Sequence, residues 1–534
     1  MKTLSVQTWI GNAAAVLCGP WGSVIDQVQH AGCSRQVAYQ HAQRVQQAVA
    51  EAQQGPPRAD LLQERDHLRD ENRQLWQALE HAIDLPPAKQ QHFAAQAAAL
   101  GLSLNQTESL LAILLPPDAR PSRATLGRWV EAAARTAGRV LQALDGACHT
   151  LVSQLCLDEI FCHRQPLLIG VEPHSMAWVL GQRAKDCSGD TWLQVLQPWT
   201  HLESVVCDAG SGLQTALRKL HQQRLDTPGG RTFESGLDLF HIKQEGQRVL
   251  RLLWSPVEKA WSEAEKADKK LASKRWHGDK GPAQNAAHLA GRAWRKAAKV
   301  LANYERQEAA WRRLEGAFEL FRADGQVNDR NWAEVEIAGA VEQLSGALWS
   351  KVRRYVEDPR CLTFLDRLHR GLTKAEGRPK VRAALVELWR LRHGGPRGRG
   401  PQFDGVIGKI KPLVQAVVCR GLAKNWRAAY RRVSGVLGGV VRASSVVECM
   451  NSVVRMHQAR HRNLSQGLLD LKRLYWNCRR FKAGKRRDAC PYQHLGLALP
   501  TYDWWQLLQT EPAELRRMKP PELTEKLSIQ QLAA

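Results

Sequence analysis

Three short apolar segments follow one another between residues 151 and 181, and they constrain the fold of this 534-residue chain more than any other feature. LVSQLCLDEIF (151–161), PLLIGV (166–171) and AWVLG (177–181) are each bounded by turn residues, as expected of buried β-strands. Residues 190–203 have a helical pattern. SVVCD (204–208) is a further apolar strand, which ends at Ala-Gly-Ser-Gly before another helical segment. The order β-β-β-α-β-α predicts an α/β core.

Acidic residues lie on two of these strands and on a helix far downstream. Asp158 is near the end of the first strand, Asp208 ends the fourth, and Glu448 lies in an otherwise apolar helical run. Mg²⁺ prefers oxygen ligands, and one or two carboxylates per ion suffice when phosphate oxygens complete its coordination. Two such ions support in-line displacement at phosphorus. We therefore predict that Asp158, Asp208 and Glu448 are catalytic and bind two Mg²⁺ (or Mn²⁺) ions.

Glu159 is an alternative to its neighbour Asp158. Successive side chains on a strand point to opposite faces of the sheet, so only one of the two can face the metal ions. Alternation alone does not choose between them; the family resemblance given below favours Asp158, and Glu159 stays open as the substitute.

Together, these elements and acids resemble the RNase H-like core of DDE transposases, those of bacterial insertion sequences in particular. In that family one acid sits on the first strand, one ends the fourth strand, and a glutamate lies on a late helix. The stretch DLFH (238–241) resembles a motif that follows the second acid, and SSVVECMNSVVRMHQAR (444–460) resembles the terminal pattern E-x-x-N-x-x-x-R. The resemblance covers about residues 150–300 and 440–500. It implies that the first strand lies centrally, beside the strand that bears Asp208.

Further site residues follow from the terminal helix and from the DLFH stretch. Asn451 and Arg455 lie three and seven positions after Glu448, on one face of the helix, and are expected to position DNA phosphate. His241 is expected to lie near the metal ions without binding them, although an ordinary structural histidine is the alternative.

The formal net charge of +24 favours a nucleic-acid partner, because excess Lys and Arg neutralise phosphates. Double-stranded DNA, as transposon ends and target, is the expected partner. The twelve cysteines have neither zinc-finger nor disulfide-framework spacing. No apolar stretch is long enough to span a membrane. These features lead us to expect a cytoplasmic, nucleoid-associated protein with reduced thiols and no membrane contact.

Two helical modules precede the predicted core. Residues 21–50 have the pattern of a helix-turn-helix in which Ser34 caps a second helix that presents Arg35 and Gln36. Residues 100–144 form a second candidate, in which Arg123 and Arg128 open the last helix. We expect both modules to contact DNA, and ordinary helical hairpins are the alternative.

A heptad pattern lies between these modules. Leu61, Leu68, Leu75 and Ala82 recur every seven residues, and Asn72 lies at the alternate core position. This pattern predicts a short parallel coiled coil and a homodimer in fixed register. The alternative is a helix that packs on its own domain.

The 239 residues between Asp208 and Glu448 are expected to form a helical insertion containing nine tryptophans. Such an insertion resembles that of the hAT type, in which an aromatic residue can stack on a displaced base, and Trp276 beside Arg275 is the candidate. The Gly-, Pro- and Arg-rich run 393–405 is expected to be a basic connector. A basic stretch after Glu448, which includes Lys472, Arg473, Arg479 and Arg480, is expected to hold phosphate.

The predicted fold class is thus an α/β RNase H-like catalytic core, a mixed β-sheet flanked by helices, with all-α N-terminal modules and a large all-α insertion. The predicted function is that of a DNA transposase, which cleaves transposon ends and transfers strands. A junction-resolving nuclease on the same core and a transposase-derived DNA-binding regulator remain alternatives. The predicted domains are a helix-turn-helix module (1–58), a coiled coil (59–83), a second DNA-binding module (84–147), the core (148–247 and 440–500), the insertion (248–439) and a C-terminal tail (501–534).

Overall fold

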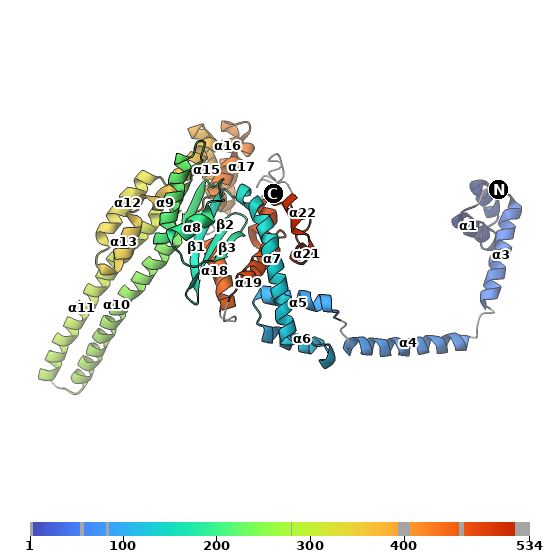
Figure 1. The fold of residues 1–534 in the computed structure, drawn as a ribbon, viewed down its shortest axis with the longest axis horizontal. Coiled ribbons are helices and arrows are strands. Elements are labelled where there is room, and N and C mark those ends of the chain that lie inside the picture. Colours follow the sequence, from blue (N-terminus) through green and yellow to red (C-terminus); the bar gives the residue numbers. More distant parts are fainter. Residues whose placement is uncertain are drawn as a thin grey trace. The chain divides into compact units, whose positions relative to one another are not determined.

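The computed structural model describes residues 4–53, 58–81, 85–278, 280–393, 406–458 and 464–517 (Figure 1). The basic run 393–405 lies outside these residues except for His393. The chain divides into two units: Met1–Leu85 with Leu114–Pro116, and the remainder. Most described residues are helical, and the second unit also contains one mixed β-sheet.

In the first unit, α1, α2 and α3 pack together and α4 is a single long helix. Gly32 ends α2 in the left-handed conformation at φ 62°, which a residue without Cβ adopts at little cost. The Ser34 hydroxyl accepts a hydrogen bond from the Val37 amide, so the predicted cap is present. The four helices are α1 (Val6–Leu17), α2 (Ser23–Ala31), α3 (Arg35–Gln53) and α4 (Arg58–His81).

The sheet has the strand order β3-β2-β1-β4-β5. β1 lies between β2, to which it is antiparallel, and β4, to which it is parallel. The expected central place of the first strand, beside the strand that leads to Asp208, is therefore confirmed. The strands are β1 (Gln154–Cys162), β2 (Gln165–Glu172), β3 (Ala177–Arg183), β4 (Ser204–Cys207) and β5 (Glu234–Leu237). All but β5 fall on the predicted segments, and the helix expected at 190–203 ends earlier, at Leu196.

Helices cover the sheet and share one apolar core with it. Buried side chains of α5, α7, β1 to β4, α8, α9, α18 and α19 form this core, to which the segment after residue 500 adds Leu507 and Leu515. Residues expected to form a separate second module and a tail thus pack partly on the sheet core. These helices are α5 (Pro87–Leu100), α6 (Leu104–Leu114), α7 (Arg123–Leu151), α8 (Gly189–Leu196), α9 (Ser211–Asp226), α18 (Ser445–Gln458), α19 (Gln466–Cys478), α20 (Pro491–Leu495), α21 (Trp504–Gln509) and α22 (Pro512–Arg517).

The insertion is helical, as expected, apart from an isolated bridge between Phe321 and Val327. α10 and α11 run side by side as a long hairpin (Figure 1). α10 is continuous across residue 247, where the core was expected to end. The helices are α10 (Leu239–Trp276), α11 (Lys280–Ala317), α12 (Arg330–Gln343), α13 (Ser350–Val356), α14 (Thr363–Ala375), α15 (Pro379–His393), α16 (Val406–Leu422) and α17 (Trp426–Gly438). Short 3₁₀ turns are Pro117–Ala119, Ala347–Trp349, Pro359–Leu362 and Gly484–Arg486.

Several tryptophans of the insertion pack against one another, and Trp311 and Trp349 are buried. Trp311 and Trp349 stack in its main core, and Trp261 meets Trp294 edge to face between α10 and α11.

Among the helices that the structure describes, none combines the length and apolar character needed to cross a bilayer.

Candidate metal centre

Asp158 and Asp208 lie at adjacent positions of two parallel strands. Leu157 of β1 pairs with Cys207 of β4, and each acid is the next residue of its chain. Neighbouring strands lie about 4.8 Å apart, so the two acids emerge side by side at one end of the sheet. Asp158 is buried and Asp208 half-buried.

α18 brings Glu448 to the same end of the sheet. This helix packs on β1 and β2, and its buried Asn451 donates a hydrogen bond of 2.7 Å from Nδ2 to Oδ2 of Asp158. Glu448 lies one helical turn earlier, so its carboxylate also faces Asp158. This hydrogen bond joins two stretches of chain separated by 293 positions.

The structure brings together three potential metal ligands. Asp158 of β1, His241 of α10 and Glu448 of α18 each offer one ligand atom, and these atoms lie within 4.8 Å of one another. The prediction placed Asp158 and Glu448 at the site with Asp208, and His241 close by without binding. In the structure His241 lies inside the cluster, whereas Asp208 lies beside it.

Asp238 fixes the entry of α10 and the start of α18 against each other. This side chain is completely buried. Its Oδ1 accepts hydrogen bonds from the amides of Phe240 (2.8 Å) and Ser444 (2.9 Å), and its Oδ2 accepts one from the Ser444 hydroxyl (2.5 Å). Nε2 of His241 lies 3.4 Å from the same Oδ2. One carboxylate therefore positions both helices that supply ligands.

Burial raises the pKa of Asp158 to about 6. The negative charges of Asp208 and Glu448 raise this pKa as well, while the hydrogen bond from Asn451 and the nearby His241 lower it. A buried carboxylate among other carboxylates is costly unless a cation or a proton offsets it.

Glu159 points to the other face of the sheet, as its strand position requires. A Cβ atom at Gly210 would lie 2.9 Å from Oδ1 of Asp208 and 3.2 Å from Oε1 of Glu159, so both carboxylates border this glycine. Burial raises the pKa of Glu159 to about 7, and the charge of Asp208 contributes next. Asp208 therefore lies between Asp158 and Glu159, and Glu159 belongs to the same acidic end of the sheet.

The donor set fits a divalent cation. Two carboxylates and an imidazole converge on one point. Oδ1 of the buried Asn451 has no hydrogen-bond partner among the described residues. Ligand atoms bound to one metal ion lie about 3 to 4 Å apart, since metal–ligand distances are near 2.1 Å, so small side-chain rotations would close this cluster around an ion. Asp158, Glu448 and His241 would hold the ion, and Asp208 would lie next to it.

The residues predicted to contact DNA are exposed, apart from Asn451, Lys472 and Arg473. Arg35 and Gln36 open α3, and Arg123 and Arg128 lie in the first turns of α7, where Ser122 caps the helix. The side chain of Arg123 also pairs with Glu108 at 3.1 Å. The remaining exposed residues are Trp276, which is 87% exposed at the end of α10, Arg455, Arg479 and Arg480.

Two members of the basic stretch after Glu448 have structural roles instead of the expected contact with phosphate. Lys472 is buried and donates a hydrogen bond to the carbonyl of Ala99. Arg473 is buried, and its Nη2 donates to both carboxylate oxygens of Asp145 of α7, at 2.7 and 2.6 Å. Their position between Leu471 and Leu474, in a helix that is buried on most sides, could have indicated this.

The positively charged guanidinium of Arg455 lies next to the cluster. Nη1 of Arg455 lies 3.9 Å from Oε2 of Glu448. The arginine side chain is 59% exposed, so this pair is weak and the guanidinium can turn to another anion.

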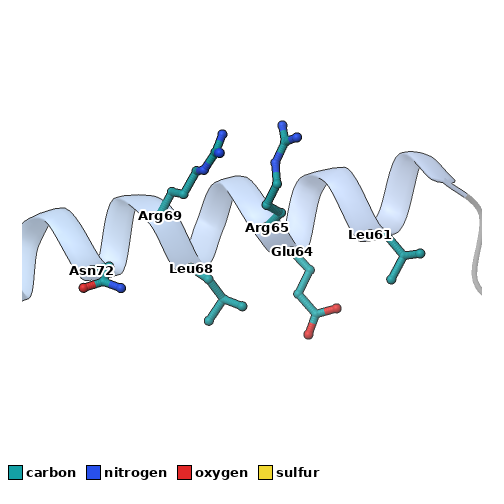
Figure 2. A pocket seen from close by; sticks show the side chains of 6 residues that line it. All are labelled: Leu61, Glu64, Arg65, Leu68, Arg69 and Asn72. Carbon is teal, nitrogen blue, oxygen red and sulfur yellow. The ribbon is translucent and has the colours of Figure 1, made fainter.

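The apolar face of α4 is exposed. Leu61 and Leu68 point to one side of the helix, and Arg65 and Arg69 point to the other (Figure 2). Leu61, Leu68 and Leu75 are each more than half exposed. The Arg65 side chain pairs with Asp66. Glu64 and Asn72 lie on the same side of the helix as Leu68, so the leucines are interspersed with polar residues (Figure 2). Ala82 lies outside the described residues. The predicted dimer through this side stays a prediction.

Asp238 and Ser444 were not predicted as part of the site. Asp238 belongs to the DLFH stretch, and its helix-capping position was a usable signal. Nothing in the sequence indicated that Ser444 would pair with it, because the contact spans 206 positions.

The sequence was compared with models of protein families and with curated proteins, and the structure with solved structures. None of these comparisons found a match.

Proposed function

We propose that this chain is a DDE-type transposase, which uses divalent cations to cleave the ends of a DNA element and join them to target DNA. In this proposal the sheet and its flanking helices are an RNase H-like core, and Asp158, Asp208 and Glu448 are its catalytic acids. The observation that carries the proposal is the meeting of Asp158 and Glu448 at one metal-ligand cluster, next to Asp208 on the adjoining parallel strand.

Strand order supports the assignment of the core. The family resemblance required the first strand to be central and to adjoin the strand of the second acid, and β1 has this place. It also required a glutamate on a late helix that returns to the first acid. The bond from Asn451 to Asp158 ties that helix to the sheet.

In the proposed reaction, water attacks phosphorus at the element end and the bond to the 3′ oxygen breaks. The released 3′ hydroxyl then attacks a phosphorus of target DNA, so that one phosphodiester bond breaks as another forms. When bound, divalent cations would activate the attacking oxygen and neutralise charge on the leaving one. The acids hold these cations, Asn451 keeps Asp158 oriented, and the exposed Arg455 binds a DNA phosphate near the site.

DNA recognition is assigned to the exposed helix starts that precede the core. Arg35 and Gln36 on α3 would meet one groove, and Arg123 and Arg128 on α7 would contact the backbone or a second groove. The exposed Trp276, beside Arg275, is the residue available for base stacking. A homodimer formed through α4 would bring two element ends together.

Strand transfer in vitro tests the proposal. The substrate is a labelled duplex that carries an end of the element, taken from the inverted repeats that flank the coding sequence, with a supercoiled plasmid as target and Mg²⁺ or Mn²⁺ present. The wild-type chain should insert the labelled end into the plasmid, and Asp158→Asn and Glu448→Gln should not. Asp226→Asn, a change of an exposed acid on α9, should retain activity.

The same assay separates the two alternatives. A junction-resolving nuclease would cut branched DNA without joining it, and a DNA-binding regulator would bind the ends without cutting. Either result would refute the proposed activity.

A further inference from the structure

We propose that Asp158, His241 and Glu448 form a binding site for a transition-metal ion in which the His241 imidazole is a direct ligand, so that the site prefers Mn²⁺ to Mg²⁺. The inference rests on the proposed function only in that it concerns the same site. It goes further because the family resemblance assigns three carboxylates and no histidine to the metal ions.

The position of His241 carries the inference. Its ring lies within 4.8 Å of ligand oxygens from both Asp158 and Glu448. It enters from α10, the first helix of the insertion, while the two acids come from the sheet and from α18. Three elements therefore meet at this cluster, as expected of a cation-binding site. A histidine exposed on the surface would have no such neighbours.

Nε2 of His241 is buried and has no hydrogen-bond partner among the described residues. It lies 3.4 Å from Oδ2 of Asp238, a carboxylate held by Ser444, without a hydrogen bond between them. A buried ring nitrogen without a partner is available to a metal ion. The buried Asn451 holds Asp158 in place, because its Nδ2 donates a hydrogen bond to Oδ2 of that carboxylate.

The ligand chemistry sets the metal preference. Mg²⁺ favours oxygen ligands and releases its waters reluctantly, whereas imidazole is a good ligand for first-row transition metals. A set of two carboxylates and one imidazole therefore favours Mn²⁺ over Mg²⁺. The adjacent pair of Asp208 and Glu159 offers oxygen atoms alone, so a preference for Mn²⁺ at this end of the sheet depends on His241.

Pulsed electron paramagnetic resonance of Mn²⁺ bound to the full chain tests the inference without DNA. A nitrogen bound to Mn²⁺ gives a characteristic modulation of the spin echo. The wild-type chain should show this nitrogen signal. His241→Gln and His241→Asp should lose it and should bind Mn²⁺ at least about tenfold more weakly in competition with Mg²⁺.

The matched control is His174→Ala, a change of an exposed histidine that should keep the signal. Circular dichroism and thermal melting establish that each variant is folded. The inference is overturned if the wild-type chain binds no Mn²⁺, if its Mn²⁺ shows no nitrogen signal, or if both His241 variants retain that signal. These outcomes are independent of strand transfer, so a failure here differs from a failure of the proposed activity.

Discussion

At the scale of single residues, the surroundings of Asp158 disfavour its ionised form. It is buried beside two other carboxylates, and its pKa of about 6 lies well above its ordinary value of 3.8. Without a cation, ionisation of this residue opposes folding. The alternation of side chains along a strand limited the site residue to Asp158 or Glu159. Asn451 was predicted on the correct helix face, but it was expected to position DNA, whereas it donates a hydrogen bond to Asp158.

A dependence of stability on pH follows from this pKa. The pKa of Asp158 is raised on folding. Protonated Asp158 therefore makes its full contribution to the free energy of unfolding below about pH 4, and this contribution is lost as the pH rises through about 6. Asp158→Asn stays neutral at every pH. In EDTA, the unfolding free energy of this variant minus that of the wild type should therefore increase by about 2 kcal/mol between about pH 4 and about pH 7.5. Urea titrations at each pH measure this difference in unfolding free energy. A difference that does not change with pH would contradict the raised pKa.

Removal of the second acid should separate catalysis from binding. Asp208→Asn removes a carboxylate beside the cation site, and cation stabilisation of the reaction is worth several kcal/mol, so we expect cleavage to fall about 1,000-fold. Binding of element ends, measured by gel shift, should change less than about threefold, because the exposed arginines of α3 and α7 are elsewhere in the chain. Equal losses of binding and cleavage would make Asp208 a structural residue.

At the scale of elements, the pair of Asp238 and Ser444 holds α10 and α18 in place. Ser444→Ala removes a hydrogen bond from a hydroxyl to a buried carboxylate, and a bond to a charged group is worth about 1.5 to 3 kcal/mol. We expect a loss of about 2 kcal/mol in stability and weaker Mn²⁺ binding. Ser452→Ala, a change on the exposed side of the same helix, is the control and should alter neither.

α4 gives a second test at this scale. If its leucine side pairs two chains, Leu68→Glu should convert a dimer into a monomer, because a charge at a core position of a coiled coil is buried on association. His67→Glu introduces the same side chain one position away and should leave the dimer intact. Sedimentation equilibrium measures both, and a wild-type monomer would refute the zipper.

The elements themselves were largely predictable, and their assembly was not. Apolar runs fixed four of the strands, because buried strands have few other sequence patterns. β5 was missed because its sequence, Glu-Ser-Gly-Leu, contains one apolar residue. The packing of α7 against α19 was also missed, since it joins distant parts of the chain, such as Arg473 and Asp145, which lie 328 positions apart.

At the scale of the whole molecule, the charge of +24 predicts binding that weakens with salt. If Arg123 and Arg128 each contact one phosphate, their joint replacement by Ala should reduce the slope of log affinity against log salt concentration by about 1.8. Fluorescence anisotropy with an element end measures this slope. An unchanged slope with unchanged affinity would mean that α7 does not contact the DNA.

The two ends of the long insertion lie next to each other. The amide of Leu239 donates a hydrogen bond to the carbonyl of Arg442, and Asp238 binds Ser444. The polypeptide thus leaves the sheet core and returns to it at neighbouring positions. Changes of length at the tip of the α10–α11 hairpin can accumulate during evolution without displacing the ligands, whereas α13 and α14 contact the loop after Asp208 and the sheet through Tyr355 and Arg367.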